Sequence, residues 1–182
     1  MTVRSVAHEA LSRLVLDVPD FPEPGVVFKD ITPLLADHVG FAAVVAALAE
    51  TGRDETGATC VDAVVGLEAR GFVFAAPVAL ALGVGFVPVR KAGKLPRSAH
   101  QVSYTLEYGA ASLELHHDAL TPGDRVLVVD DVLATGGTLL AARQLVEACG
   151  ATVAGVALLM ELGFLDGRAV VGDLPLHPIV TI

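Results

Sequence analysis

Three short apolar runs in the chain are each followed directly by charged residues. The runs cover residues 61–67, 84–89 and 126–129, and the residues that follow them are Glu68, Arg90 and Asp130. Short runs rich in β-branched residues are typical of strands that are buried on both faces of a parallel sheet. Because ligands of open parallel sheets bind beyond the carboxyl ends of the strands, the three charged ends predict one common binding site.

Segments with helical spacing separate these strands. We expect helices at residues 75–82, with Pro77 in the first turn, and at residues 138–149, where apolar residues recur on one face. Two further helices are predicted, a small amphipathic one within residues 1–18 and one rich in Ala and Val at residues 40–50. The alternation of strands and helices predicts an α/β fold, in which helices flank a mainly parallel sheet.

Three segments have patterns of another kind. Residues 18–25 contain three prolines and a glycine, which predicts a shaped, non-helical segment. Residues 91–103 are polar and predict a mobile loop, whereas residues 103–117 alternate between polar and apolar and predict a β-hairpin or flap. Because the chain has no internal repeat and no linker-like stretch, we expect a single domain over residues 1–182.

Charge and cysteine content narrow the function. The net charge of −9 argues against general nucleic-acid binding, so an anion site has to be built locally from basic side chains or backbone N–H groups. Cys60 and Cys149 belong to no CxxC pair or His cluster, which makes structural zinc unexpected and favours a reduced compartment. No apolar run reaches membrane-spanning length and no export signal is evident, so a cytoplasmic location without a membrane partner is expected.

The segment from Val128 to Thr138 carries the clearest chemistry. A strand delivers Asp130 and Asp131, and a tight turn with two glycines and two threonines then leads into a helix. Converging N–H groups and a helix N-terminus suit a monophosphate, for which the candidate residues are Ala134, Thr135, Gly136, Gly137 and Thr138. The two carboxylates suit the hydroxyls of a ribose, with Mg²⁺ nearby. The alternative is a capped helix after a buried strand, with both carboxylates merely solvated.

This segment resembles the motif with which type I phosphoribosyltransferases bind 5-phosphoribosyl 1-pyrophosphate (PRPP). Residues 21–34, 66–72, 86–91 and 106–109 are similar to signature segments of the family members that use adenine, in the same order over about residues 8–160. The resemblance implies the type I phosphoribosyltransferase fold with a β-flap or flexible loop over the active site. It also implies a purine-specificity segment at about residues 18–36 and a core at about residues 38–182.

The resemblance also implies roles for charged residues outside this motif. Pyrophosphate would be bound by Glu68, Ala69, Arg70, Arg90, Lys91 and Lys94, and the peptide bond between Glu68 and Ala69 is expected to be cis. The residues implied in catalysis are Glu107, Arg70 and Lys91. From the residues alone, Arg70 could form an ordinary ion pair with Glu68, the basic run could be a solvated charge run, and Glu107 could be a strand residue facing water.

Adenine would be bound by Phe28, whose ring is implied to stack on the base, and by backbone groups of Val27 and Lys29. An aromatic residue in the run Val26-Val27-Phe28 could equally belong to a hydrophobic core. Lys29 stands where many family members have Arg, residues 98–102 depart from the usual polar loop, and the tail at residues 162–182 can be placed only loosely.

The reaction implied by the resemblance is adenine + PRPP ⇌ AMP + pyrophosphate, a step of purine salvage, with Mg²⁺ as cofactor and held mainly by PRPP near Asp130 and Asp131. A homodimer is implied as well. One alternative is the same chemistry on orotate or on a 6-oxopurine such as hypoxanthine, guanine or xanthine. Others are a PRPP-sensing regulator without catalysis, which would need a DNA-binding module for which the early start of the match leaves no room, and a non-catalytic oligomerisation subunit.

Overall fold

The computed structural model describes residues 2–105 and 110–182. The chain forms two compact units, Met1–Ala47 and Leu48–Ile182, and each is described by itself. The prediction of a single domain therefore stays a prediction. Over the described part of the chain, no helix is long and apolar enough to cross a membrane.

The N-terminal unit is made of short elements. They are α1 (Val3–Leu14), β1 (Leu16–Pro19), β2 (Val27–Asp30) and α2 (Thr32–Ala36), and α3 (His38–Ala49) leads out of the unit. Helix α1 is the predicted amphipathic helix, and it buries Ala7, Ala10 and Leu11. Strands β1 and β2 pair antiparallel through a turn that contains a cis Phe21–Pro22 bond, so the proline-rich segment is non-helical as predicted.

The described residues of the second unit form a seven-stranded sheet in the order β5-β6-β4-β3-β7-β8-β9. The strands are β3 (Ala63–Leu67), β4 (Gly85–Lys91), β5 (Ala99–Thr105), β6 (Ala110–His116), β7 (Arg125–Leu133), β8 (Thr152–Glu161) and β9 (Leu176–Thr181). The five strands from β4 to β9 in this order are parallel, and β6 and β5 add an antiparallel edge. The mainly parallel α/β sheet predicted from the sequence is confirmed.

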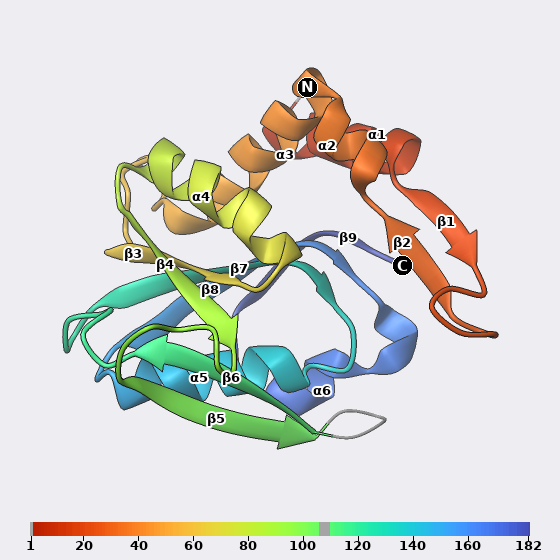
Figure 1. Ribbon diagram of the computed structural model, residues 1–182. Helices are drawn as coiled ribbons and strands as arrows, with labels where there is room; N and C mark the ends of the chain where they lie inside the picture. The colour runs from red at the N-terminus through yellow and green to blue at the C-terminus, as the bar shows by residue number, and fades with distance from the viewer. Residues whose placement is uncertain (1, 106–109) are drawn as a thin grey trace. The chain divides into compact units, whose positions relative to one another are not determined.

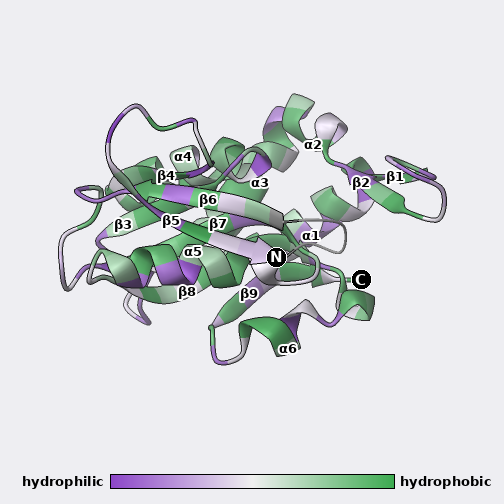
Figure 2. Ribbon diagram, turned by 60° about the horizontal axis from the view of Figure 1, so that its bottom comes forward, coloured by the Kyte–Doolittle hydropathy of each residue, from purple (hydrophilic) through white to green (hydrophobic). Residues whose placement is uncertain are grey.

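Helices cover the sheet of the second unit. Figure 1 shows α4 (Arg70–Leu82) on one face of the sheet and α5 (Gly137–Ala148) with α6 (Gly167–Val171) on the other. Helix α5 buries an apolar stripe against β5, β6 and β8, and its exposed face is polar, which gives it both colours in Figure 2. Short 3₁₀ turns, η1 (Glu50–Gly52) and η2 (Gly163–Leu165), complete the unit.

Three segments differ from the sequence predictions or add to them: two in where an element begins, and one in the elements that it forms. Helix α4 begins at Arg70 rather than at residue 75, so Pro77 lies inside the helix; the helix continues past it because Phe74, Val78 and other residues of one face are buried. Strand β5 begins at Ala99, so only residues 92–98 of the predicted loop connect two strands, because residues 99–105 pair with β6. The loosely placed tail forms η2, α6 and the edge strand β9, parallel to β8.

Candidate active site

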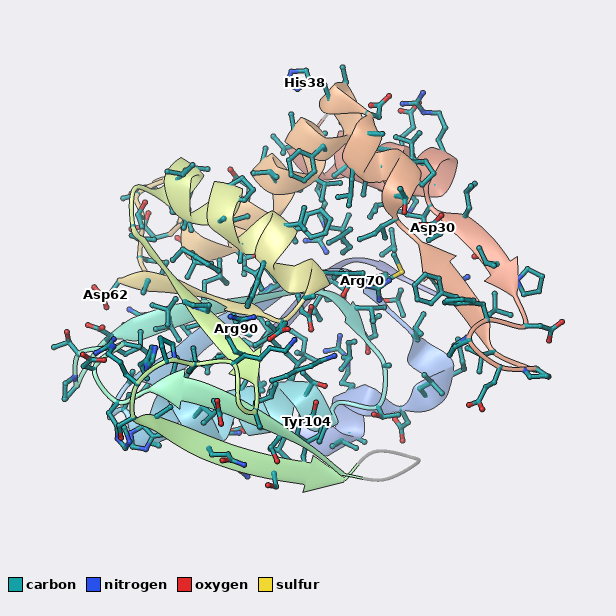
Figure 3. The ribbon with its side chains drawn as sticks, viewed as in Figure 1. Asp30, His38, Asp62, Arg70, Arg90 and Tyr104 are labelled. Carbon is teal, nitrogen blue, oxygen red and sulfur yellow. The ribbon has the colours of Figure 1, made fainter. Side chains whose placement is uncertain are left out.

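The carboxyl ends of β4, β3 and β7 meet at a cavity of about 570 Å³. These strands are adjacent and parallel, so the three charged ends lie together as the sequence predicted. The lining residues are Glu68, Ala69, Arg70, Lys91, Tyr104, Ala111, Leu113, Asp130, Asp131, Val132, Leu133, Ala134, Thr135, Gly136, Thr138 and Leu139. The volume is in the range of small-molecule sites. Figure 3 shows Arg70, Arg90 and Tyr104 on three different elements of this unit.

The phosphate loop, defined as Ala134, Thr135, Gly136, Gly137 and Thr138, connects β7 to α5. Gly136 has φ +86°, a left-handed conformation that side chains other than hydrogen rarely allow, and it precedes the first residue of α5. The N-cap residue of α5 is Gly136, which has no side chain to cap the helix. First-turn N–H groups without a capping side chain are a ready site for an anion, and the helix dipole adds positive potential. The loop therefore fits the predicted monophosphate site.

The acidic pair beside the loop is shielded rather than merely solvated, since Asp131 is buried and Asp130 is partly buried. Burial raises the pKa of Asp130 well above its ordinary range, and the charge of Asp131 adds to that rise. Burial also raises the pKa of Asp131, while Arg70 opposes the rise through an ion pair of 2.8 Å between Nη2 and Oδ2. The guanidinium of Arg70 thus offsets part of the negative charge of these three residues. Such a group can accept ribose hydroxyls with less repulsion of a nearby phosphate.

The first turn of α4 packs directly on Asp130. A Cβ added at Gly71 would lie 2.8 Å from Asp130 Oδ1 and 2.9 Å from the carbonyl oxygen of Val129. The peptide bond between Glu68 and Ala69, just before this turn, is cis, as the resemblance implied. The glycine lets the helix place Arg70 beside the acidic pair.

Glu68 binds three basic residues at and just after the end of β4, namely Arg90, Lys91 and Lys94. Its Oε1 accepts from Lys94 Nζ at 2.6 Å, and its Oε2 accepts from the backbone N–H of Lys91 at 2.9 Å and from Arg90 Nε at 3.2 Å. Burial of Glu68 raises its pKa, but these hydrogen bonds, led by that of Lys94, together lower it to about 2. Lys91 lines the cavity, whereas Arg90 and Lys94 contact Glu68 and do not line the cavity. Glu68 therefore orders the basic cluster as its counter-ion.

These contacts predict an acid-dependent loss of stability. The pKa of Glu68 in the fold, about 2, lies below the ordinary value of 4.5. A lowered pKa stabilises the fold above the unfolded pKa, and that contribution is lost as the pH falls through the folded pKa. We expect the free energy of unfolding of the wild type to exceed that of Glu68→Gln by up to about 3 kcal/mol above pH 5, and the difference to vanish near pH 2. Urea unfolding at a series of pH values measures it, and a difference independent of pH would contradict the ion-pair assignment.

Tyr104 is a cavity residue that the sequence interpretation missed. It lies on β5, lines the cavity, and its hydroxyl accepts a hydrogen bond of 3.3 Å from Thr138 Oγ1 of the phosphate loop. A signal for it was present: Val102 and Tyr104 are two apart on a strand, so they share the face that packs on the core. A buried Tyr hydroxyl needs a polar partner, which here is a residue of the predicted site.

Other predicted residues belong to the N-terminal unit or fall outside the described residues. Glu107 falls outside the described residues. Val27, Phe28 and Lys29 lie on β2 in the N-terminal unit, where Lys29 Nζ is 2.6 Å from Asp17 Oδ1 and the half-buried ring of Phe28 meets the ring of Phe21 edge-on at 5.1 Å. Their part in base binding stays a prediction.

The donor set of the cavity is suited to Mg²⁺ that arrives with a substrate. No group of three or more His, Cys, Asp or Glu side chains that could hold a metal ion is found among the described residues. The acidic pair supplies two adjacent carboxyl groups, and Asp131 is already paired with Arg70. Because Mg²⁺ usually keeps several waters and binds one or two carboxylates plus substrate phosphates, Asp130 and Asp131 fit such an ion.

Comparison with known proteins gives the class first. Residues 34–168 match the phosphoribosyl transferase domain, which spans the phosphate loop, the acidic pair and the basic strand ends. The fold and site thus define a phosphoribosyltransferase.

Individual relatives narrow the class. The adenine phosphoribosyltransferase of Nocardioides sp. is 68% identical over 174 residues, which cover 96% of this chain and 94% of that protein. The crystal structure of the enzyme of that name from Thermoanaerobacter pseudethanolicus has a TM-score of 0.89 and 45% identity, over 96% of this chain and 99% of that one. The crystal structure of the enzyme from Saccharomyces cerevisiae, complexed with adenine and an imino-altritol bisphosphate, has a TM-score of 0.90 and 39% identity. The match covers 96% of this chain and 98% of that one. The chain belongs to the adenine phosphoribosyltransferase family.

Proposed function

We propose that this chain transfers the 5-phosphoribosyl group of PRPP to adenine, giving AMP and pyrophosphate in purine salvage. One observation carries the proposal: residues of the phosphate loop, the acidic pair and the cations Arg70 and Lys91 line the same cavity. Relatives up to 68% identical that are named for the adenine reaction support the choice of acceptor.

In the proposed reaction, the phosphate loop holds the 5′-phosphate and the acidic pair accepts hydrogen bonds from the ribose hydroxyls. A purine nitrogen forms the bond to C1′ as the bond from C1′ to the pyrophosphate oxygen breaks, the leaving pyrophosphate takes the electron pair, and the purine loses a proton. Arg70 and Lys91, which line the cavity, are proposed to face the leaving group, where negative charge grows and where fixed cations stabilise such charge well. Bound Mg²⁺ would supply further charge neutralisation of the pyrophosphate oxygens.

Glu107 is proposed to face the ribose and the base, where it would stabilise positive charge on the ribosyl group or hold the purine proton. We propose that Phe28 stacks on adenine and that Val27 and Lys29 contact its edge. The half-buried ring of Phe28 and its place in a segment that resembles the adenine-specific members support this assignment. Arg90 and Lys94 are proposed to turn from Glu68 to the pyrophosphate when PRPP binds, since both are cations at the end of β4.

Replacing Phe28 tests the acceptor site. For Phe28→Ala we expect the KM for adenine to rise roughly 10- to 100-fold, because stacking of a base on an aromatic ring is worth about 1–3 kcal/mol. The KM for PRPP should change much less. Steady-state kinetics with each substrate varied in turn measures both constants. An equal rise of both would mean that Phe28 is a core residue of its unit.

A homodimer in the cytoplasm is part of the proposal. Leu80 of α4 is 83% exposed, and Val73 of α4 and Phe86 of β4 are exposed as well. A symmetric partner would cover this apolar surface and support Arg70 at the start of the same helix. The cytoplasmic location is supported by Cys60 and Cys149, which form no disulfide.

The reaction is tested by incubating the purified protein with PRPP, Mg²⁺ and one base at a time, with separation of the nucleotide products. We expect AMP from adenine and far less product from hypoxanthine, guanine, xanthine or orotate. A preference for a 6-oxopurine would keep the proposed phosphoribosyl transfer but replace adenine as the acceptor. A protein that binds PRPP and forms no nucleotide with any base would favour the non-catalytic PRPP-sensing regulator.

A further inference from the structure

The phosphate loop touches a second segment, the C-terminal turn, defined as residues 161–168. A Cβ added at Gly136 would lie 2.6 Å from the carbonyl oxygen of Gly167, and one added at Gly167 would overlap the carbonyl oxygen of Ala134. The two glycines therefore let the backbones of the loop and the turn lie in direct contact. A shift of Gly167 would be transmitted to Ala134 and Gly136.

The C-terminal turn contacts the phosphate loop but not the cavity. The described residues 161–168 are all absent from the cavity lining, which includes Ala134, Thr135 and Gly136. An effect of the turn on a ligand would therefore be indirect, through the loop or through Leu133, which precedes the loop and also lines the cavity.

An ion pair fixes the turn. Arg168, the residue after Gly167, donates from Nε to Glu161 Oε1 at 2.9 Å and from Nη2 to Oε2 at 2.6 Å. A planar pair with two parallel hydrogen bonds fixes orientation as well as distance. The side chain of Glu161 is buried, whereas that of Arg168 is half exposed. The pair ties both ends of the turn together and leaves Gly167 little freedom.

The same pair is tied to the strand that carries the phosphate loop. Glu161 is the last residue of β8 and pairs with Leu133, the last residue of β7 before the loop. The next N–H along the chain, that of Leu162, donates to the carbonyl oxygen of Leu133 at 2.9 Å. The loop is thus held at its start by β8 and along its length by Gly167.

We infer that Arg168 and Glu161 are positioning residues for the 5′-phosphate, which hold Gly167 against the phosphate loop and keep the loop in its binding conformation. This inference rests on the proposed function. Neither residue touches the ligand. Loss of the pair loosens the loop and leaves a buried carboxylate without its cation.

Binding measurements on Arg168→Ala test the inference. We expect AMP and ribose 5-phosphate to bind about 5- to 30-fold more weakly by calorimetry, and adenosine, which lacks the phosphate, to bind within about 2-fold of wild type. The KM for PRPP should rise by a factor similar to that of the AMP dissociation constant. The kcat at saturating PRPP should stay within about 3-fold of the wild-type value. Arg168→Lys, which keeps the charge without the planar fork, should fall between the two.

Arg143→Ala is the matched control. Arg143 lies on α5 and also forms two ion pairs, with Glu147 and Asp173, but both partners are largely exposed. Its removal should leave AMP binding within about 2-fold of wild type. Thermal unfolding of each variant shows whether the fold is kept.

A folded Arg168→Ala or Arg168→Lys that binds AMP as the wild type does would overturn the inference and leave the proposed function intact. An equal loss of AMP and adenosine binding would overturn it too, because the effect would then not concern the phosphate. A wild-type protein that binds neither AMP nor ribose 5-phosphate would instead overturn the proposed function and the inference with it.

Discussion

Arg70→Ala is expected to lower kcat/KM for PRPP by about 10²- to 10³-fold, equivalent to about 3–4 kcal/mol. Arg70 supplies a guanidinium to the cavity and pairs with Asp131, whose side chain is only 7% exposed. Removing one partner of a buried pair leaves the other charge uncompensated, which costs about 3–5 kcal/mol. Without Arg70 the pKa of Asp131 would also rise further, because Arg70 makes the largest of the contributions that oppose the effect of burial. Steady-state kinetics with PRPP varied at saturating adenine measures the loss.

Two further variants distinguish the role of the Arg70 guanidinium from the effect of simply losing one positive charge. Arg70→Lys keeps the charge without the planar fork and should fall between wild type and Arg70→Ala. Arg97 pairs with Asp118 at 2.7 Å, but both side chains are more than 60% exposed, so Arg97→Ala should change kcat/KM by no more than about 2-fold. Wild-type kinetics in a folded Arg70→Ala variant would show that Arg70 has no part in PRPP binding or catalysis.

Gly71→Ala is expected to weaken binding of PRPP and AMP by about 10- to 100-fold. The added Cβ would lie 2.8 Å from Asp130 Oδ1 and 2.9 Å from a backbone oxygen, so either the start of α4 or the acidic pair has to move. Overpacking of this kind costs about 1–3 kcal/mol. Helix propensity alone predicts that Gly71→Ala would stabilise α4, since Ala is about 1 kcal/mol more favourable than Gly within a helix. Calorimetry with AMP measures the change.

Gly85→Ala provides the control for Gly71. Gly85 opens β4, and no atom lies within 4 Å of a Cβ added there. Gly85→Ala should bind AMP as the wild type does. If Gly71→Ala also keeps wild-type affinity, the contact between α4 and Asp130 has no part in holding the ribose.

The strand ends and the phosphate loop could be predicted because their signals are local. A strand buried on both faces has to be apolar, so the change to Glu68, Arg90 and Asp130 marks where each strand reaches the ligand edge. The loop needs glycine at Gly136 because its backbone is left-handed there. Both signals can be read from neighbouring residues, without knowledge of contacts with distant parts of the chain.

The features that the sequence did not reveal depend on distant contacts. Gly71 and Pro77 argue against a helix locally, and α4 nonetheless begins at Arg70 because its apolar face is buried. The role of Glu68 as counter-ion of Lys94 follows from sheet register and from the path of the connection after β4. The pair of Glu161 and Arg168 likewise appears only once the tail folds back beside the phosphate loop.

A crystal structure of the protein soaked with AMP tests the central claim most directly, since it locates the phosphate and the ribose in one experiment. We expect the 5′-phosphate to lie against the backbone of Thr135, Gly136 and Gly137, with the ribose hydroxyls on Asp130 and Asp131. A phosphate seated instead among Arg90 and Lys94, or a ribose directed away from the acidic pair, would contradict it.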